Sequence, residues 1–191
     1  MLAIDQSFLE LLLHPKGKPP NDPKTGKPIE RLPDRLEELI ERWETDGETI
    51  IIPTPALSQF MILAHHEASD YLAKIHGSRY FKIESFDERA AVELAAIHIG
   101  AMSNRQRKRV HGKSEATWAK VNFDRQIVAV AKVHGAKAIY SDDKTLNTFA
   151  KALGIEPVSS WELPFPKEKQ AELVEKETEP KARAISLDED V

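Results

Sequence analysis

Three aspartates in this sequence are placed where their carboxylates could act together on a metal ion. Asp5 ends the short apolar run that begins at Met1, Asp124 opens an amphipathic stretch, and Asp143 follows the strand-like run 138–141. If these runs are parallel strands and their connecting helices, the three side chains meet at one edge of the sheet. Carboxylates gathered there repel one another unless a cation lies between them, and oxygen ligands suit Mg²⁺ and Mn²⁺. The pattern therefore favours metal-dependent phosphodiester chemistry.

Each aspartate also has a simpler structural interpretation. Asp124 and Asp143 precede predicted helices and could cap their N-termini, with Asp142 as a turn residue. Asp5 could be a turn residue after its strand. Only the combination of all three favours a metal site.

The composition predicts a single globular domain from a reducing compartment. The chain has 191 residues, of which 41% are hydrophobic, and it has no cysteine. These values fit one domain without disulfides or thiolate metal sites. The apolar cluster Leu9–Leu13 is too short for a membrane span or a signal peptide. We therefore expect a cytoplasmic protein that makes no contact with a membrane.

Apolar runs alternate with amphipathic stretches along the chain, and this predicts an α/β fold. Strands are expected at 1–4, 49–53, 80–83, 137–141 and 155–158. Helices are expected at 8–13, 34–43, 55–76, 88–101, 144–153 and from 124 onward. The domain should span residues 1–161, with 14–33 as an irregular insertion rich in proline and lysine. Residues 162–191 form a charged tail that we expect to be flexible.

The net charge of −4 is unevenly distributed. Residues 162–191 hold nine acidic and five basic side chains, so the rest of the chain is neutral overall. Within that neutral part, segment 104–113 carries five cationic side chains and no acid. Such a segment can neutralise nucleic-acid phosphates, although it can equally be a solvated loop between helices. The tail can be inert, or it can dock through its few apolar residues.

The order and spacing of these motifs resemble the PIN-domain family of metal-dependent ribonucleases, which includes bacterial toxins of the VapC type. The family opens with a strand, an aspartate and a small polar residue two positions later. It continues with an aspartate opening an Ala- and Ile-rich helix, a turn with glycine, a strand and a Ser/Thr-x-Asp motif. The matching residues here are Asp5, Ser7, Asp124, Gly135, Ser141 and Asp143. The resemblance covers about residues 1–160, without the insertion.

This resemblance implies a three-layer α/β/α domain with a central parallel sheet that hydrolyses RNA with Mg²⁺ or Mn²⁺. It implies that Asp5, Asp124 and Asp143 are catalytic residues and metal ligands, and that the hydroxyls of Ser7 and Ser141 orient them. We expect the RNA backbone to be held by the basic residues Arg105, Arg107, Lys108, Arg109, Lys113 and Lys120. A chain of the toxin type would also have a neutralising protein partner, and a homodimer is expected by resemblance.

One residue departs from the family pattern. Gln59 stands where many members have a glutamate early in the helix after the second strand. Its amide oxygen can still face a metal, but it brings no negative charge. Asp142 is the carboxylate best placed in the sequence to compensate. The departure leaves open an alternative function, a catalytically impaired PIN-like module that binds RNA or protein.

Overall fold

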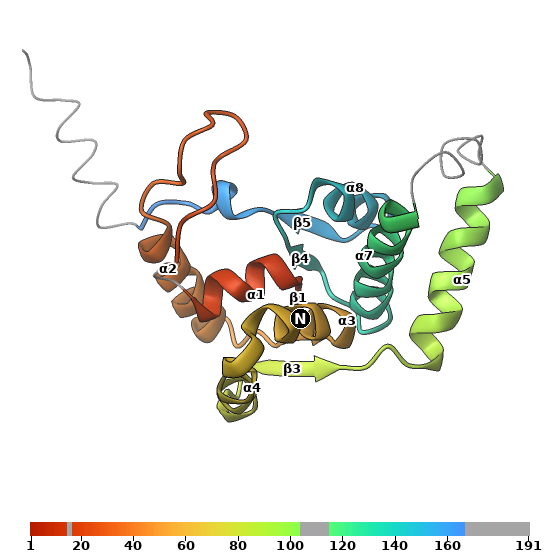
Figure 1. Ribbon diagram of the computed structural model, residues 1–191, viewed down its shortest axis with the longest axis horizontal. Helices are drawn as coiled ribbons and strands as arrows, with labels where there is room; N and C mark the ends of the chain where they lie inside the picture. Colours follow the sequence, from red (N-terminus) through yellow and green to blue (C-terminus); the bar gives the residue numbers. More distant parts are fainter. Residues whose placement is uncertain (15–16, 104–114, 167–191) are drawn as a thin grey trace, which may run out of the picture.

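Five parallel strands form the centre of the fold (Figure 1). The computed structural model describes residues 1–14, 17–103 and 115–166. The strands are β1 (Leu2–Ile4), β2 (Ile50–Pro53), β3 (Phe81–Glu84), β4 (Ala138–Tyr140) and β5 (Glu156–Val158). They lie in the order β3-β2-β1-β4-β5, and every neighbouring pair is parallel. The predicted α/β fold with a central parallel sheet is confirmed.

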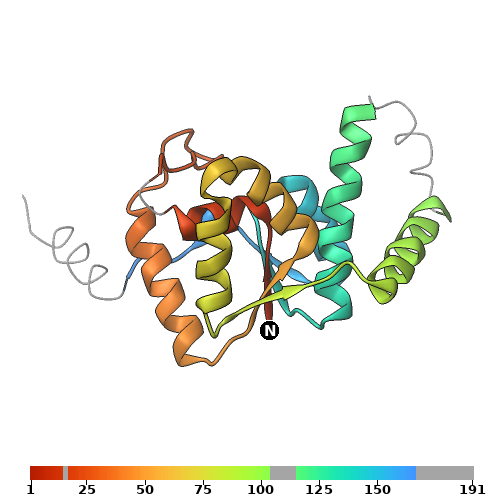
Figure 2. The ribbon, with the colours of Figure 1, turned by 60° about the horizontal axis from the view of Figure 1, so that its bottom comes forward.

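Helices cover both faces of this sheet, as Figures 1 and 2 show. On one face Ile50 and Ile52 belong to the same buried cluster as residues of α1 (Gln6–Leu13), α2 (Leu32–Thr45) and α4 (Ala68–Gly77). On the other face Ile51 belongs to a second cluster, with residues of α7 (Glu115–Val133) and α8 (Lys144–Ala152). Successive strand residues point to opposite faces, so a strand covered on both sides must be apolar throughout. The uninterrupted isoleucines of β2 satisfy this requirement.

The strand order creates a switch point beside β1. The chain moves outward from β1 to β2 and β3, and then crosses to β4 and β5 on the other side of β1. The ends of β1 and β4 remain joined there, because the Asp5 N–H donates to the Tyr140 carbonyl at 3.1 Å. In open parallel sheets the crevice at such a point, outside the carboxyl ends of the strands, is where ligands bind. The fold thus places the residues after β1 and β4 at a natural binding position.

The helix that carries Asp124 is longer than predicted. It begins at Glu115, so Asp124 lies in its middle rather than at its start. The residues before Asp124 include alanines and a lysine and contain no helix breaker, so the helix continues through them. The interpretation of Asp124 as an N-cap is therefore wrong. The helix ends at Val133, and Gly135 adopts a positive φ of 70° in the turn between α7 and β4.

The helix predicted over 55–76 is broken at His65. It consists of α3 (Thr54–Ala64), the 3₁₀ turn His65–Glu67 and α4. The break turns α4 so that the Tyr71 hydroxyl contacts His14 Nδ1 at 3.1 Å and donates to Glu67 Oε2 at 3.0 Å. The contact with His14 is tertiary, and helical periodicity alone does not reveal it. The backbone at His65 adopts φ 48° and ψ −113°, which is unfavourable for a side chain with a Cβ.

Replacing His65 by glycine should therefore stabilise the protein. The free energy gained by relieving the strained positive φ should exceed the cost of the extra conformational entropy of glycine in the unfolded chain. The net increase in the free energy of unfolding is about 0.5–1 kcal/mol. For a domain of this size that raises Tm by about 1–4 °C. The matched control is His66→Gly, because His66 is equally exposed and is not among the residues with positive φ. If thermal unfolding shows that Tm falls equally in both variants, the backbone at His65 is not strained.

The remaining helix, α5 (Glu88–Ser103), extends away from the sheet and packs against α7 (Figure 2). The Asp87 side chain caps it by accepting the Ala90 N–H at 2.9 Å. Residues 104–114 follow it and lie outside the described residues. The predicted RNA-binding residues Arg105, Arg107, Lys108, Arg109 and Lys113 are in that segment.

The folded body continues beyond the predicted boundary at residue 161. The Leu163 side chain is buried in the core, and Arg35 Nη1 donates a hydrogen bond to the Leu163 carbonyl at 2.9 Å. The Arg35 guanidinium also lies 3.8 Å from the centre of the Phe165 ring. A single leucine and phenylalanine within a charged sequence gave no periodic signal for this contact. Residues 167–191 lie outside the described part of the chain, so the flexible tail stays a prediction.

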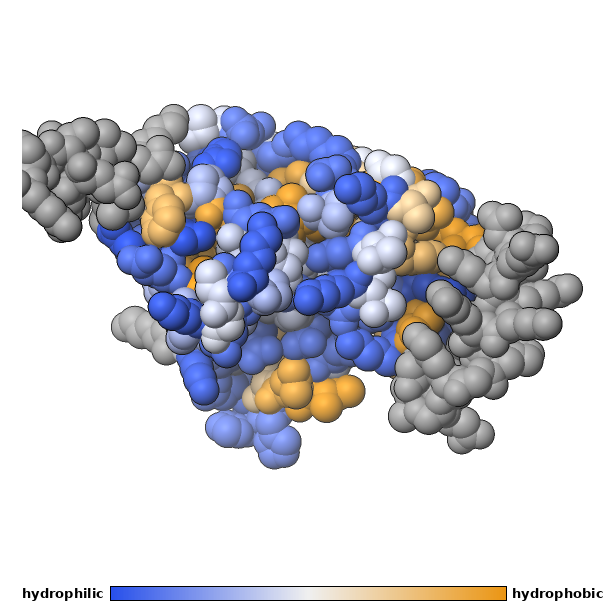
Figure 3. Space-filling model, turned by 90° about the horizontal axis from the view of Figure 1, so that it is seen from above, coloured by the Kyte–Doolittle hydropathy of each residue, from blue (hydrophilic) through white to orange (hydrophobic). Residues whose placement is uncertain are grey.

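The described surface is mostly hydrophilic in the view from above, with hydrophobic residues in separate patches (Figure 3). Within the same residues, none of the helices has both the length and the apolar character needed to cross a membrane.

Candidate active site

A cavity of about 250 Å³ opens at the switch point of the sheet. The residues that line it are Asp5, Gln6, Ser7, Gln59, Lys120, Asp124, Ile127, Asp142, Asp143 and Leu146. They come from the β1–α1 junction, from α3, from α7 and from the segment between β4 and α8. The fold thus brings the three predicted aspartates to one place from widely separated parts of the chain.

Asp5 is fixed by several hydrogen bonds. Its carboxylate accepts the Phe8 N–H at 2.8 Å and thereby caps α1. The Ser7 hydroxyl donates to it at 2.8–2.9 Å, and the Ser141 hydroxyl donates to Oδ2 at 2.5 Å. Burial raises the pKa of Asp5 to about 6, although these hydrogen bonds act in the opposite direction. The carboxylate is therefore held rigidly in a position where its negative charge is costly.

The two serines join Asp5 to the chain segment that carries Asp143. Ser7 Oγ accepts the Asp142 N–H at 3.3 Å, and Ser141 Oγ accepts the Asp143 N–H at 3.0 Å. Each hydroxyl therefore donates to Asp5 and accepts from the β4–α8 segment. This geometry fits the orienting role predicted for both residues, and the effect on a metal ion stays a prediction.

Asp124 differs from the other two aspartates because it has an unsatisfied oxygen. The residue is 6% exposed, and its Oδ2 is buried without a hydrogen-bond partner among the described residues. A buried acceptor of this kind costs about 1–3 kcal/mol. Burial, together with the negative charges of Asp143 and Asp5, raises the pKa of Asp124 to about 6, while the positive charge of Lys120 opposes the shift. A cation beside Asp124 would remove this cost.

Asp143 uses its two oxygens for different partners. Oδ1 accepts the N–H groups of Thr145 at 2.7 Å and Leu146 at 3.1 Å, so the predicted capping of α8 is confirmed. Oδ2 accepts a hydrogen bond from Lys120 Nζ at 2.5 Å. Burial acts to raise the pKa of Asp143, but these hydrogen bonds outweigh it and the pKa is lowered. Capping and cation binding are therefore compatible in one carboxylate.

Lys120 was predicted to contact RNA, and the structure places its ammonium on Asp143 instead. The hydrogen bond to Asp143 raises the pKa of Lys120, and the charges of Asp143, Asp124 and Asp5 contribute to the same shift. Lys120 precedes Asp124 by four residues, a spacing that puts both side chains on the same face of α7. This spacing is a sequence signal that the lysine faces the aspartates.

Asp142 and Gln59 line the same cavity in different ways. Asp142 Oδ1 accepts the Ser160 N–H at 2.7 Å, and Oδ2 accepts the Ser160 hydroxyl at 2.6 Å. Both oxygens therefore hold the 3₁₀ turn Ser160–Glu162 against the β4–α8 segment. Gln59 reaches the cavity from α3 and is half-buried. The sequence suggested that Asp142 could compensate for the missing glutamate. In the structure both of its oxygens are already bonded to Ser160.

The chemistry of these donors suits a hard divalent cation. Three carboxylates converge on the cavity, and one of their oxygens is buried without a partner. Oxygen donors of this type are those that hold Mg²⁺ and Mn²⁺. Within residues 1–14, 17–103 and 115–166, no three His, Cys, Asp or Glu side chains already form a group arranged to hold a metal ion. The three aspartates remain candidate ligands.

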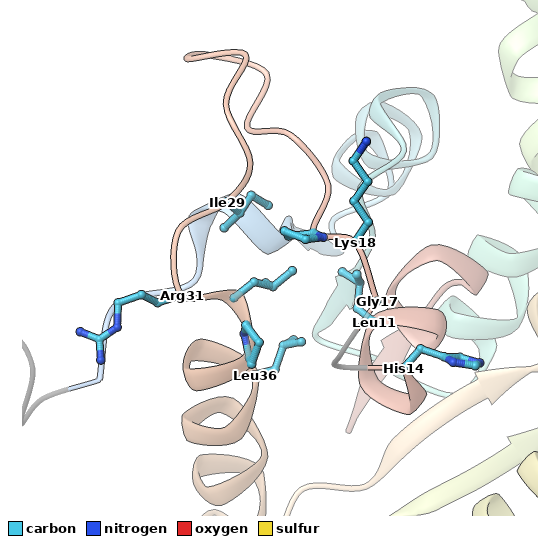
Figure 4. Close-up of a pocket in the computed structure, with 10 residues that line it drawn as sticks. Leu11, His14, Gly17, Lys18, Ile29, Arg31 and Leu36 are labelled. Atoms are coloured by element: carbon cyan, nitrogen blue, oxygen red, sulfur yellow. The ribbon is translucent and has the colours of Figure 1, made fainter.

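A second cavity of about 230 Å³ lies between α1, the insertion and α2 (Figure 4). Leu11, Ile29 and Leu36 contribute apolar side chains, and Lys18 and Arg31 extend away from each other. The cavity has no carboxylate among its lining residues. The metal chemistry predicted from the sequence therefore belongs to the first cavity.

Comparisons with known proteins give a distant structural likeness and no family match. The sequence matches no model of a known protein family and none of the curated proteins. Among solved structures the chain is similar to VapC20 of Mycobacterium tuberculosis, described as a sarcin-ricin loop cleaving toxin. The TM-score is 0.46 with 16% identity, and the match covers 81% of this chain and 96% of that chain. At this distance the likeness transfers no residue role, and the site must be judged on its own geometry.

Proposed function

We propose that this chain is a metal-dependent endoribonuclease that hydrolyses RNA phosphodiester bonds. The observation that carries the proposal is the convergence of Asp5, Asp124 and Asp143 at the switch point, with a buried oxygen of Asp124 left without a partner. A cation satisfies such an arrangement, and metal-bound carboxylates are common in phosphodiester hydrolysis. The choice of RNA rests on the sequence resemblance.

Each aspartate would contribute to the site in its own way. The serines and the first turn of α1 hold Asp5, and the first turn of α8 holds Asp143, so both carboxylates are ordered before any ligand arrives. Asp124 presents an oxygen that no other group in the described part of the chain uses. A bound Mg²⁺ or Mn²⁺ supplies Lewis-acid polarisation of the phosphate and a water of lowered pKa. The capped N-termini of α1 and α8 add positive potential for a phosphate group.

Binding of the RNA backbone is assigned to the basic segment. Residues 104–114 connect α5 with α7, and α7 carries Asp124 into the cavity. Arg105, Arg107, Lys108, Arg109 and Lys113 would neutralise phosphates on either side of the cleaved bond. A toxin-type role, a neutralising protein partner and a homodimer are further parts of the same proposal.

The proposal is tested by incubating a mixed RNA substrate with Mn²⁺, with Mg²⁺ and with EDTA. We expect cleavage with either metal and none with EDTA. Because water rather than the ribose 2′-hydroxyl would attack, a single 2′-deoxy substitution at the cleaved nucleotide should leave cleavage intact. Cleavage that persists in EDTA, or that requires the 2′-hydroxyl, would contradict metal-assisted hydrolysis.

A second candidate function is an impaired PIN-like module that binds RNA or protein without cleaving it. Gln59 favours it, because this half-buried residue lines the cavity and adds no charge where a glutamate would serve as a ligand. One fewer negative charge weakens the attraction for a divalent ion.

Gln59→Glu separates the two functions. If the site is intact but weak, the added carboxylate should raise Mn²⁺ affinity and the cleavage rate by about ten-fold, equivalent to about 1.4 kcal/mol of charge attraction. Gln6→Glu is the matched control, because it adds the same charge to the same cavity. A larger effect at Gln59 than at Gln6 would identify a ligand position. An inactive parent that gains neither binding nor cleavage from Gln59→Glu would favour the binding module.

A further inference from the structure

Lys120 gives the three-aspartate cavity a cation of its own. We propose that this ammonium occupies the cation position beside Asp143 until a divalent ion displaces it, and that the released side chain then binds an RNA phosphate. The inference rests on the proposed function and adds a device that couples metal binding to RNA binding.

The contact between Lys120 and Asp143 has the properties of a displaceable bond. Lys120 Nζ lies 2.5 Å from Asp143 Oδ2, while the lysine side chain is 62% exposed and the aspartate side chain 21% exposed. The lysine therefore reaches the carboxylate from solvent. An ion pair with one exposed partner is weak, because water and salt compete with it. A divalent ion can replace the ammonium without opening the core.

The carboxylate is held in place independently of the lysine. Asp143 Oδ1 accepts two N–H groups of α8, and these bonds do not involve Lys120. The orientation of Asp143 is therefore set by the helix. A departing ammonium leaves a carboxylate oxygen in the cavity that Asp124 also lines.

The charges of the cavity explain why displacement would favour RNA. Asp5, Asp124 and Asp143 all attract Lys120, and together they exceed its single positive charge. A divalent ion neutralises more of this negative charge than an ammonium does. The freed ammonium loses its carboxylate partner and stays at the mouth of the cavity, where a phosphate of the substrate can replace that partner. Metal and RNA should therefore strengthen each other's binding.

The test compares the parent with Lys120→Met, which keeps the length of the side chain and removes its charge. In the absence of RNA, Mn²⁺ titrations followed by electron paramagnetic resonance should show about five-fold tighter binding in Lys120→Met. In the presence of Mn²⁺, KM for RNA should rise several-fold in the same variant. In EDTA, RNA affinity should change little, because Lys120 is then engaged with Asp143.

The matched control is Lys144→Met, which removes an exposed positive charge next to Asp143 in the sequence. We expect that variant to bind Mn²⁺ as the parent does. An equal gain in both variants would overturn the inference, because it would reflect general charge rather than displacement. Equal Mn²⁺ affinity in parent and Lys120→Met would also overturn it and leave the proposed nuclease intact. If neither protein binds Mn²⁺, both the inference and the proposed function fail.

Discussion

Asp124→Asn should abolish metal-dependent RNA cleavage and at the same time stabilise the metal-free protein at pH 7. The loss of one metal ligand should lower the rate by about a thousand-fold, the equivalent of about 4 kcal/mol of transition-state stabilisation. The stability should rise because the asparagine removes a buried negative charge that faces two others. A gain of about 2 kcal/mol is expected from a pKa raised to about 6, which corresponds to about 4–8 °C in Tm.

The opposite signs of these two effects make the prediction specific. A buried aspartate with a structural role normally loses stability on substitution, because its hydrogen-bond partners are left unpaired. Asp87→Asn serves as the control, since that exposed residue caps α5 and asparagine caps equally well. Cleavage and thermal unfolding should be unchanged in the control. Asp124→Asn with parental cleavage, or with markedly lower stability, would show that Asp124 is a structural residue.

The metal-free protein should lose stability between pH 4 and pH 7 because of Asp5 and Asp124. Both have a pKa of about 6 in the folded state, against 3.8 without the fold. A raised pKa means that the folded state binds the proton more tightly than the unfolded state. The stabilising contribution is therefore complete below pH 3.8 and is lost as the pH rises through 6. Between pH 4 and pH 7, one shift of this size removes about 2 kcal/mol of stability.

Other groups make the protein less stable as the pH falls, which opposes the effect of Asp5 and Asp124. The pH dependence of the parent must therefore be compared with that of a variant. The lowered pKa values of Glu48 and Asp143 contribute stability that disappears as the pH falls through them. The lowered pKa of His98, caused chiefly by burial, also costs stability as the pH falls below 6.5. The contributions of Glu48 and His98 are common to the parent and to Asp124→Asn. The difference between the two proteins therefore reports Asp124 and its electrostatic coupling to Asp5 and Asp143.

Urea unfolding from pH 4 to pH 8 measures this difference. In EDTA the stability advantage of Asp124→Asn should be near zero at pH 4 and grow to about 2 kcal/mol at pH 7. Saturating Mn²⁺ at pH 7 should cancel or reverse it, because a ligand at about 100 times its Kd adds about 2.7 kcal/mol to the parent alone. If the stability advantage of Asp124→Asn does not depend on pH, or if Mn²⁺ leaves it unchanged, Asp124 is not a buried ionised carboxylate whose charge a bound cation neutralises.

Sequence patterns predicted the structural setting of the two aspartates at strand ends, but not that of the aspartate on the helix. Asp5 and Asp143 follow short apolar runs, and the geometry of a parallel sheet brings such positions together. Asp124 lines the cavity as its position in the pattern suggested, but it was wrongly interpreted as a helix start. Its helix begins at Glu115, and the preceding residues carry no signal that separates a helix interior from a boundary.

Contacts between distant segments could not be predicted from local patterns. Asp142 binds Ser160, and Arg35 holds the carbonyl of Leu163, and neither pair has a periodic signature. The break at His65 likewise depends on Tyr71 reaching His14 across the core. Local periodicity reports which face of an element is apolar, whereas these contacts depend on how finished elements pack.

The central claim is that Asp5, Asp124 and Asp143 together hold a divalent ion. The most direct test is a Mn²⁺ titration of the RNA-free protein, followed by electron paramagnetic resonance, for the parent and for the three single Asp→Asn variants. A saturable site in the parent that is weakened at least about ten-fold in every variant is the result we predict, since each variant loses one charged ligand. A parent that binds no Mn²⁺, or variants that bind it as tightly as the parent, would contradict the claim.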